Sequence, residues 1–234
     1  MINPRQERIL AAVVQEYVAN AQPVASKCLA EKTDFNVSPA TIRNDMVTLE
    51  EAGLLRQPHT SSGRIPTEEG YRYFLERFVR KKRVPKVQVR LSITQAQPAD
   101  TFKDYLRGMS KSLVKVSGET AFISQEDGWH YYTGVANLFD KPEFNDVVRM
   151  KELSHLVDEF DEVVRRIAPG MNNDVNVWIG GQNPFGSEMA TVMVKYTTKN
   201  QKSGVIGLVG PQRMNYARNM KLLNEARDAI QSKL

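Results

Sequence analysis

Two neighbouring side chains, Arg43 and Asn44, carry hydrogen-bonding groups that can distinguish one nucleobase from another. An arginine donates to both major-groove acceptors of guanine, and an asparagine forms a bidentate pair with adenine. Both belong to segment 38–67, whose pattern predicts a recognition helix followed by a β-wing. An apolar stripe recurs along this helix at helical spacing, at Ile42, Met46 and Leu49. Asn44 lies opposite that stripe and Arg43 at its border, so the predicted chemistry is the recognition of duplex DNA.

Other side chains around these two are candidate DNA contacts. The outer face of the helix is small and polar, which suits a groove about 12 Å wide. Thr41 and Thr48 are short, so we expect them to hold phosphates or to meet a thymine methyl group. Arg56 and Arg64 flank the wing and are candidates for phosphate or minor-groove contact. The predicted DNA-contacting residues are Ser38, Ala40, Thr41, Arg43, Asn44, Thr48, Arg56, His59, Thr60, Ser61 and Arg64.

Two of these candidates have a purely structural alternative. The alternative for Arg43 is an ion pair with Glu50 or Asp45 instead of contact with a base. His59 lies in the predicted wing, where it would either contact a phosphate or only shape the turn.

The elements that must position these side chains have clear local signals. Ser38 is a good N-cap, Pro39 suits the first helical position, and Gly53 suits a left-handed C-cap. Upstream, an amphipathic helix is predicted over 4–19, and Ser26 is the expected cap of a short second helix. This order of helices is typical of a helix-turn-helix motif.

The wing and a closing helix follow directly. Residues 54–57 and 64–66 are predicted strands, joined by the turn-forming stretch 58–63. Thr67 is the expected cap of a further helix that has two glutamates in its first turn, near the positive end of the helix dipole. The predicted apolar face of this helix is Tyr71, Phe74, Leu75, Phe78 and Val79.

The distribution of charge favours the same half of the chain. The 234 residues include 32 Lys and Arg against 27 Asp and Glu, a net charge of +5. Residues 1–90 hold 15 basic and 10 acidic side chains, whereas residues 91–234 hold 17 of each. All of the excess positive charge therefore lies in the predicted DNA-binding half, as a phosphate-facing surface requires.

Composition argues against several other classes of protein. A single cysteine, Cys28, excludes an internal disulfide and is typical of a reducing cytoplasm. No apolar run approaches the roughly 18 residues of a membrane span, and no signal-peptide core is present. The histidines have no metal-ligand spacing, and no nucleophile motif stands out. We therefore predict a cytoplasmic protein that is not an enzyme, with no catalytic residue, metal or cofactor.

The second half predicts an antiparallel-rich α+β domain, because helices and strands alternate without strict βαβ spacing. Strands are expected at 85–98, 121–123, 131–135, 175–179, 190–196 and 204–209. Helices are expected at 101–117, 143–167 and 211–230. The predicted division is a winged helix-turn-helix domain at 1–84 and a regulatory or dimerisation domain at 85–234.

The chain resembles the heat-inducible transcription repressor family, HrcA. The string PHTSSGRIPTEEGYRYF, which covers the wing and the closing helix, is selective for that family. Two distal strings also match, GVANLFDKPEF at 134–144 and GVIGLVGPQRMNYARNM at 204–220. The resemblance implies a repressor that binds an inverted-repeat operator, the CIRCE element, before chaperone operons as a homodimer. It also implies a GAF-like second domain and dependence on the chaperonin GroEL.

The chain departs from this family in two places. Typical members carry an inserted dimerising domain, but here His130-Tyr131-Tyr132 runs almost directly into the string GVANLF. Any dimer would then use the GAF-like domain or the winged helices. In addition, the family has an acidic loop where this chain has Ile179-Gly180-Gly181-Gln182-Asn183.

The pattern and the resemblance together predict a repressor of chaperone genes that is released on heat stress. The alternative is a winged-helix regulator whose GAF-like domain senses a small metabolite.

Overall fold

The computed structural model describes residues 2–32, 35–60, 62–80, 101–144 and 146–233. The chain divides into two compact units, Met1–Pro85 and Lys86–Leu234. The division falls within residues 81–100, which lie outside the described residues. The boundary expected after residue 84 and the strand expected over 85–98 lie there as well.

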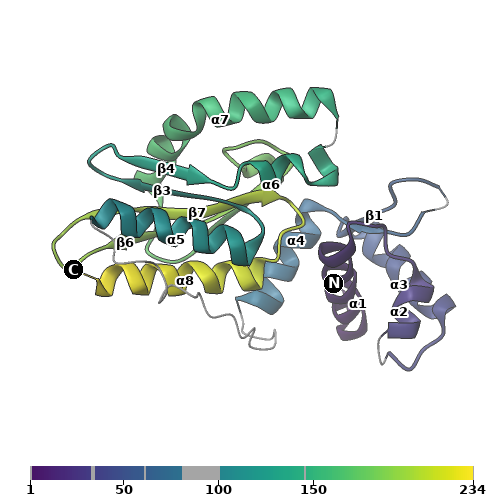
Figure 1. The fold of residues 1–234 in the computed structure, drawn as a ribbon. Helices are drawn as coiled ribbons and strands as arrows, with labels where there is room; N and C mark the ends of the chain where they lie inside the picture. The colour runs from purple at the N-terminus through teal and green to yellow at the C-terminus, as the bar shows by residue number, and fades with distance from the viewer. Residues whose placement is uncertain (1, 33–34, 61, 81–100, 145, 234) are drawn as a thin grey trace. The chain divides into compact units, whose positions relative to one another are not determined.

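The first unit begins with three helices, α1 (Pro4–Asn20), α2 (Ser26–Lys32) and α3 (Pro39–Glu51) (Figure 1). A capping box starts α1, because the side chains of Asn3 and Gln6 each accept from the other residue's backbone N–H. Ser26 is the first residue of α2 rather than the residue before it. The helix-turn-helix order predicted from the sequence is therefore present.

The ends of α3 follow from the residues that were expected to set them. Ser38 has extended backbone angles, and its hydroxyl accepts from the backbone N–H of Thr41 at 3.2 Å. Pro39 is the first helical residue. After the helix, Gly53 has a φ of 72°, a left-handed conformation that costs glycine little. Ile42, Met46 and Leu49 are all buried, as their spacing predicted.

The wing is an antiparallel pair of short strands, β1 (Leu55–Arg56) and β2 (Ile65–Pro66). Val24 adds a third strand position, because it exchanges two backbone hydrogen bonds with Arg64, at 2.9 and 3.0 Å. Gly63 permits this approach, since a Cβ there would lie 2.4 Å from the carbonyl carbon of Val24. The wing is thus held to the body of the unit by backbone pairing as well as by side chains.

The closing helix, α4 (Glu68–Phe74), starts where Thr67 accepts from the backbone N–H of Gly70. It continues as a π-helical turn, η1 (Leu75–Val79), in which Arg80 N–H donates to the carbonyl of Leu75. Of the predicted apolar face, Tyr71, Phe74 and Leu75 are buried, whereas Phe78 and Val79 are only half-buried.

A five-stranded antiparallel sheet forms the centre of the second unit, in the order β4-β3-β7-β6-β5. Its strands are β3 (Thr120–Gln125), β4 (His130–Thr133), β5 (Asn176–Ile179), β6 (Met189–Thr197) and β7 (Ser203–Pro211). The antiparallel α+β class predicted from the sequence is confirmed. Every neighbouring pair is antiparallel. The strand order places β4 and β5 at the two edges of the sheet.

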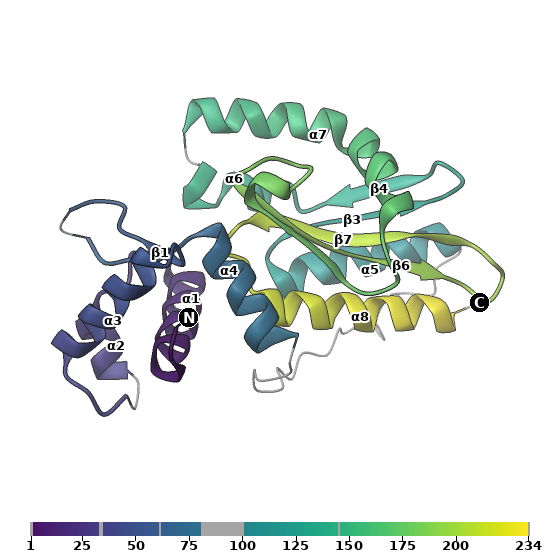
Figure 2. The ribbon, with the colours of Figure 1, turned by 180° about the vertical axis from the view of Figure 1, so that it is seen from behind.

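Helices cover both faces of this sheet (Figures 1 and 2). The two helices on one face, α5 (Phe102–Ser117) and α8 (Tyr216–Ser232), contact β3 and β6 and also each other. The opposite face carries α7 (Val147–Ile167), which ends in the 3-10 turn η4 (Ala168–Gly170). Short turns complete the unit: α6 (Ala136–Phe139), η3 (Pro142–Phe144) and η5 (Gly180–Gln182).

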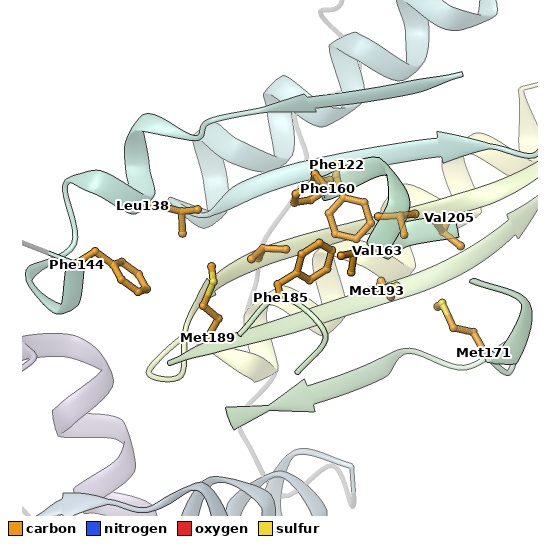
Figure 3. Packing of buried hydrophobic residues seen from close by; sticks show 12 residues of the cluster. Phe122, Leu138, Phe144, Phe160, Val163, Met171, Phe185, Met189, Met193 and Val205 are labelled. Carbon is orange, nitrogen blue, oxygen red and sulfur yellow. The ribbon is translucent and has the colours of Figure 1, made fainter. Parts of the chain in front are cut away.

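The core between α7 and the sheet is built from phenylalanine, methionine and aliphatic side chains (Figure 3). The rings of Phe122 and Phe160 meet edge to face with their centroids 5.0 Å apart, and Phe160 stacks on Phe185 at 4.6 Å. Met189 and Met193 from β6 join them from the sheet. This packing fixes the helix on that face of the sheet.

Two expectations for the second unit need correction. The final helix was expected to begin at Pro211, but Pro211 is the last residue of β7 and the helix begins at Tyr216, after the N-cap Asn215. Backbone pairing of Pro211 with Met189 extends the strand beyond the point where a proline suggests a helix start. The helix expected from residue 143 begins at Val147, because residues 142–144 form a separate 3-10 turn. In the described part of the chain, no helix has the length and apolar character needed to cross a bilayer.

Candidate nucleic-acid interface

One face of α3 is exposed and carries most of the predicted contacts. Ser38, Ala40, Arg43, Asn44 and Thr48 are exposed there, and Thr41 is half-buried. Asn44 makes no side-chain hydrogen bond within the described residues, although its backbone carbonyl accepts from the Thr48 hydroxyl at 3.3 Å. The Asn44 amide therefore offers donors and an acceptor that the described residues do not use, whereas the hydroxyls of Ser38, Thr41 and Thr48 already form hydrogen bonds within this segment.

Arg43 does not form the ion pair that was its structural alternative. The two carboxylates considered as its partners, Asp45 and Glu50, are paired with other arginines. Among the described residues Arg43 has no acidic partner, and its side chain is exposed. The guanidinium is available for an external acceptor, which is what base or phosphate recognition requires.

Asp45 anchors α3 from its buried side. Its carboxylate lies 2.7 Å from Arg5 Nε and accepts from the Gln6 side chain at 3.2 Å, so it ties α3 to the start of α1. Asp45 is only 5% exposed, and a buried carboxylate is tolerated only when its oxygens are paired. Sequence reasoning treated Asp45 only as a possible partner of Arg43 and missed this role.

Glu50 and Arg64 join α3 to the wing. The Arg64 guanidinium donates to Glu50 Oε2 at 2.8 and 2.9 Å, and the Arg64 side chain is only 11% exposed. The other oxygen of Glu50 accepts from the backbone N–H of Gln57 at 3.0 Å. The Arg64 charge is thus already paired inside the unit, which points to a role in holding the wing, and its predicted phosphate contact stays a prediction.

The tip of the wing is braced by polar side chains. Gln57 Nε2 donates to the carbonyls of Thr60 and Ser62, at 3.0 and 2.9 Å. The Ser62 hydroxyl donates to the His59 carbonyl at 2.7 Å and accepts from the His59 N–H at 3.0 Å. These bonds hold the loop in one shape while His59 and Thr60 stay exposed. Ser61 lies outside the described residues.

Two further residues complete the candidate surface. Arg56 on β1 is exposed and, within the described part of the unit, has no acidic partner, so it remains a candidate for phosphate contact. Val47 is 37% exposed on the outer side of α3 and was not among the predicted contacts. An exposed apolar side chain on a recognition helix suits a thymine methyl group. Its position at the border of the stripe was the signal available in the sequence.

The described residues hold no group of three or more His, Cys, Asp or Glu side chains that could bind a metal ion. The arrangement that the structure does build is a helix-turn-helix with a braced wing and an exposed polar helix face. It defines a winged helix-turn-helix protein of the DNA-binding class.

Comparison with known proteins specifies the family. The model of the HrcA protein C-terminal domain matches residues 44–220, and that of the DeoR-like helix-turn-helix domain matches residues 5–65. The chain belongs to the HrcA family. Its curated relatives are named heat-inducible transcription repressors, so the family is one of transcription regulators rather than enzymes.

The similarity extends over the whole chain. The heat-inducible transcription repressor HrcA of Moorella thermoacetica is 26% identical over 338 aligned positions, which cover 100% of this chain and 98% of that protein. Since this chain has 234 residues, about 104 of those positions have no counterpart in it. The repressor HrcA of Kineococcus radiotolerans is 41% identical over 123 residues, 53% of this chain and 36% of that protein.

A solved structure has the same fold. A hypothetical protein determined at 2.2 Å resolution matches with a TM-score of 0.82 and 18% sequence identity, over 99% of this chain and 98% of that chain.

Proposed function

We propose that this chain is a heat-inducible transcription repressor that binds, as a homodimer, an inverted-repeat operator of the CIRCE type before chaperone genes. Residues 1–84 would bind DNA, and residues 85–234 would supply regulation and dimer contacts. The protein would act in the cytoplasm, where its operator is, and reach its active state with the help of GroEL. The family membership supports this proposal. The main structural observation behind it is the exposed face of α3.

The roles of the side chains follow from their chemistry and exposure. Arg43 and Asn44 would read base edges in the major groove, with Val47 against a thymine methyl group. Ser38, Ala40, Thr41 and Thr48 would fit against the groove walls and hold phosphates.

The wing would add contacts beside the groove. Arg56, His59, Thr60 and Ser61 are the wing residues that we propose to meet the phosphate backbone. Arg64 would act indirectly, because its ion pair with Glu50 fixes the wing against α3.

A dimer is needed because an inverted repeat has two-fold symmetry. Two recognition helices on one side of the duplex need half-sites spaced near a multiple of roughly 10–10.5 base pairs. The missing aligned positions mean that this dimer must form without the corresponding segment of the Moorella relative.

The decisive experiment is a gel shift with a chaperone-operon promoter fragment that carries the inverted repeat. We expect specific retardation that is lost when one half-site is scrambled. We also expect release on heating and stronger binding when GroEL is added. Equal affinity for a scrambled fragment of the same length would contradict the proposal.

A further inference from the structure

A cavity of about 490 Å³ opens at one end of the sheet of the second unit. Its floor is formed by β3, β6 and β7, together with His130 of β4. Its roof is formed by the end of α7 and the turn after it, through Arg165, Ala168, Pro169 and Asn173. Cavities of roughly 300–1,000 Å³ are the size of small-molecule sites in proteins.

The floor of this cavity contains a row of paired residues, polar except for Val205, that crosses four strands. His130 pairs in register with Ser124, Ser124 with Val205, and Val205 with Lys195. Side chains two residues apart on a strand share a face, so Ser124 lies on the same face as Phe122, which packs against α7. The row therefore points to the side of the sheet that α7 covers.

This row differs from the rest of the same face. Elsewhere, Phe122 and Met193 fill the space under α7 with apolar side chains (Figure 3), and Val209 belongs to the same cluster. Polar groups placed under a helix lose solvation unless they face water or a ligand. The cavity gives these polar groups access to water or a ligand. This accounts for a lysine, a histidine and a serine at the end of an otherwise apolar face.

Two of the lining cations lack a counter-charge. Lys195 Nζ donates to the Pro169 carbonyl at 3.4 Å, and Arg165 Nε donates to the Asp161 carbonyl at 3.3 Å. In the described part of the unit, neither forms an ion pair. The one carboxylate among the lining residues is Glu126, at the exposed tip of the β3–β4 hairpin. The carbonyl end of α7 adds partial negative charge, which Arg165 in its last turn offsets.

Neutral hydrogen-bonding groups lie among these cations. Ser124 Oγ and His130 Nδ1 are 3.0 Å apart, so only one nitrogen of the ring is used within the described residues. Thr197 and Ser203 are paired two positions further along β6 and β7, and they therefore lie on the same face as the row. Gly204 lets the strands close beneath them, because a Cβ there would lie 2.0 Å from the Ser124 carbonyl oxygen.

We propose that this cavity binds a small organic anion. Its carboxylate or phosphate group would lie between Lys195 and Arg165, with donors from Ser203 and Thr197, and its apolar part would lie over Val205 and Ala168. Such a site would let the second unit sense a metabolite, a function separate from the proposed binding of the operator. The proposal of an anion site and the proposal of operator binding can therefore succeed or fail independently.

The test is thermal unfolding of the full chain followed by tryptophan fluorescence, with and without phenyl phosphate, benzoate or inorganic phosphate. Both tryptophans, Trp129 and Trp178, belong to the second unit, so the signal reports on that unit alone. A bound anion stabilises the folded state by mass action, so we expect phenyl phosphate or benzoate to raise Tm by several degrees in a saturable way. The neutral benzyl alcohol should not.

The variants Lys195→Gln and Arg165→Gln should each weaken this binding about tenfold or more, because each removes a charge-assisted hydrogen bond. Lys199→Gln is the matched control, since Lys199 is exposed just beyond β6 and does not line the cavity. The proposal is overturned if none of the three anions raises Tm, if benzyl alcohol raises it equally, or if Lys199→Gln weakens binding as much as the cavity variants. Operator binding measured in the same variants keeps the two proposals distinct.

Discussion

At the scale of single residues, the interface separates into side chains that are available for DNA and side chains that hold the frame. Arg43, Asn44 and Arg56 are exposed and are not paired with any described acidic residue. Arg64 and Asp45 belong to the frame, because each is nearly buried and bonded to a residue of another element. Both groups contain the residue types that bind DNA, so residue type alone does not separate them.

The first prediction concerns base reading. Asn44→Ala should weaken operator binding by about 1–3 kcal/mol, because one bidentate pair is lost, and leave binding to unrelated DNA nearly unchanged. Fluorescence anisotropy with both DNAs at one salt concentration measures the difference. An equal loss on both DNAs would remove Asn44 from base reading.

The second prediction contrasts two arginines of the wing. Arg64→Ala leaves Glu50 without its partner and should destabilise the first unit by about 1–3 kcal/mol, a value reduced by the partial exposure of Glu50. Calorimetry should detect this as a Tm lower by about 4–8 °C for each kcal/mol. Arg56→Ala should instead keep Tm and lower affinity for any DNA. If Arg64→Ala left Tm unchanged while weakening DNA binding, Arg64 would be a direct contact.

At the scale of elements, the two family-matching strings of the second unit meet around one buried carboxylate. Glu119 precedes β3 and is only 4% exposed. It lies 3.3 Å from Lys141 of the first string, and a Cβ at Gly210 of the second would be 2.3 Å from its carboxylate. Burial raises the pKa of Glu119 above its ordinary value, and the charge of Lys141 only partly opposes this.

A pH dependence follows from that raised pKa. The folded state binds the Glu119 proton more tightly than the unfolded state does. The resulting stability is fully present below the ordinary value of 4.5 and is lost as pH rises through the folded pKa. Glu119→Gln, which mimics the protonated acid, should therefore gain stability relative to the parent chain as pH rises from 4.5 to neutrality. Urea unfolding monitored by tryptophan fluorescence measures this difference, and parallel profiles for the two proteins would refute it.

At the scale of the whole molecule, the two units divide charge and composition between them. The excess positive charge belongs to the first 90 residues, while residues 91–234, which form the sheet and the helices on both its faces, have no net charge. The folded state of a domain is only about 5–15 kcal/mol more stable than its unfolded state. A modest temperature rise can therefore unfold a DNA-binding unit and release it from its operator. Control by heat then needs no sensor beyond the folding equilibrium.

This mechanism predicts that the temperature of release follows the stability of the first unit. Gly63→Ala should lower both, because the new Cβ would clash with the Val24 backbone at 2.4 Å. Gly170→Ala is the control, since no atom lies within 4 Å of the Cβ it would add. Circular dichroism and anisotropy on the operator, recorded over the same temperature ramp, compare the two transitions. A lowered Tm with an unchanged release temperature would argue against release by unfolding.

The sequence by itself determined most of the elements, because their signals are local. Caps such as Ser38 and Thr67, the stripe at Ile42, Met46 and Leu49, and the alternation in the strands each act over a few residues. Only the tertiary structure decided which charged side chains are already paired. Arg5 pairs with Asp45 across 40 positions of the sequence, and Arg64 pairs with Glu50 across 14 positions. Such partners are determined by packing between elements, which no local sequence pattern shows. The polar row beneath the end of α7 likewise forms only when four strands pair in register.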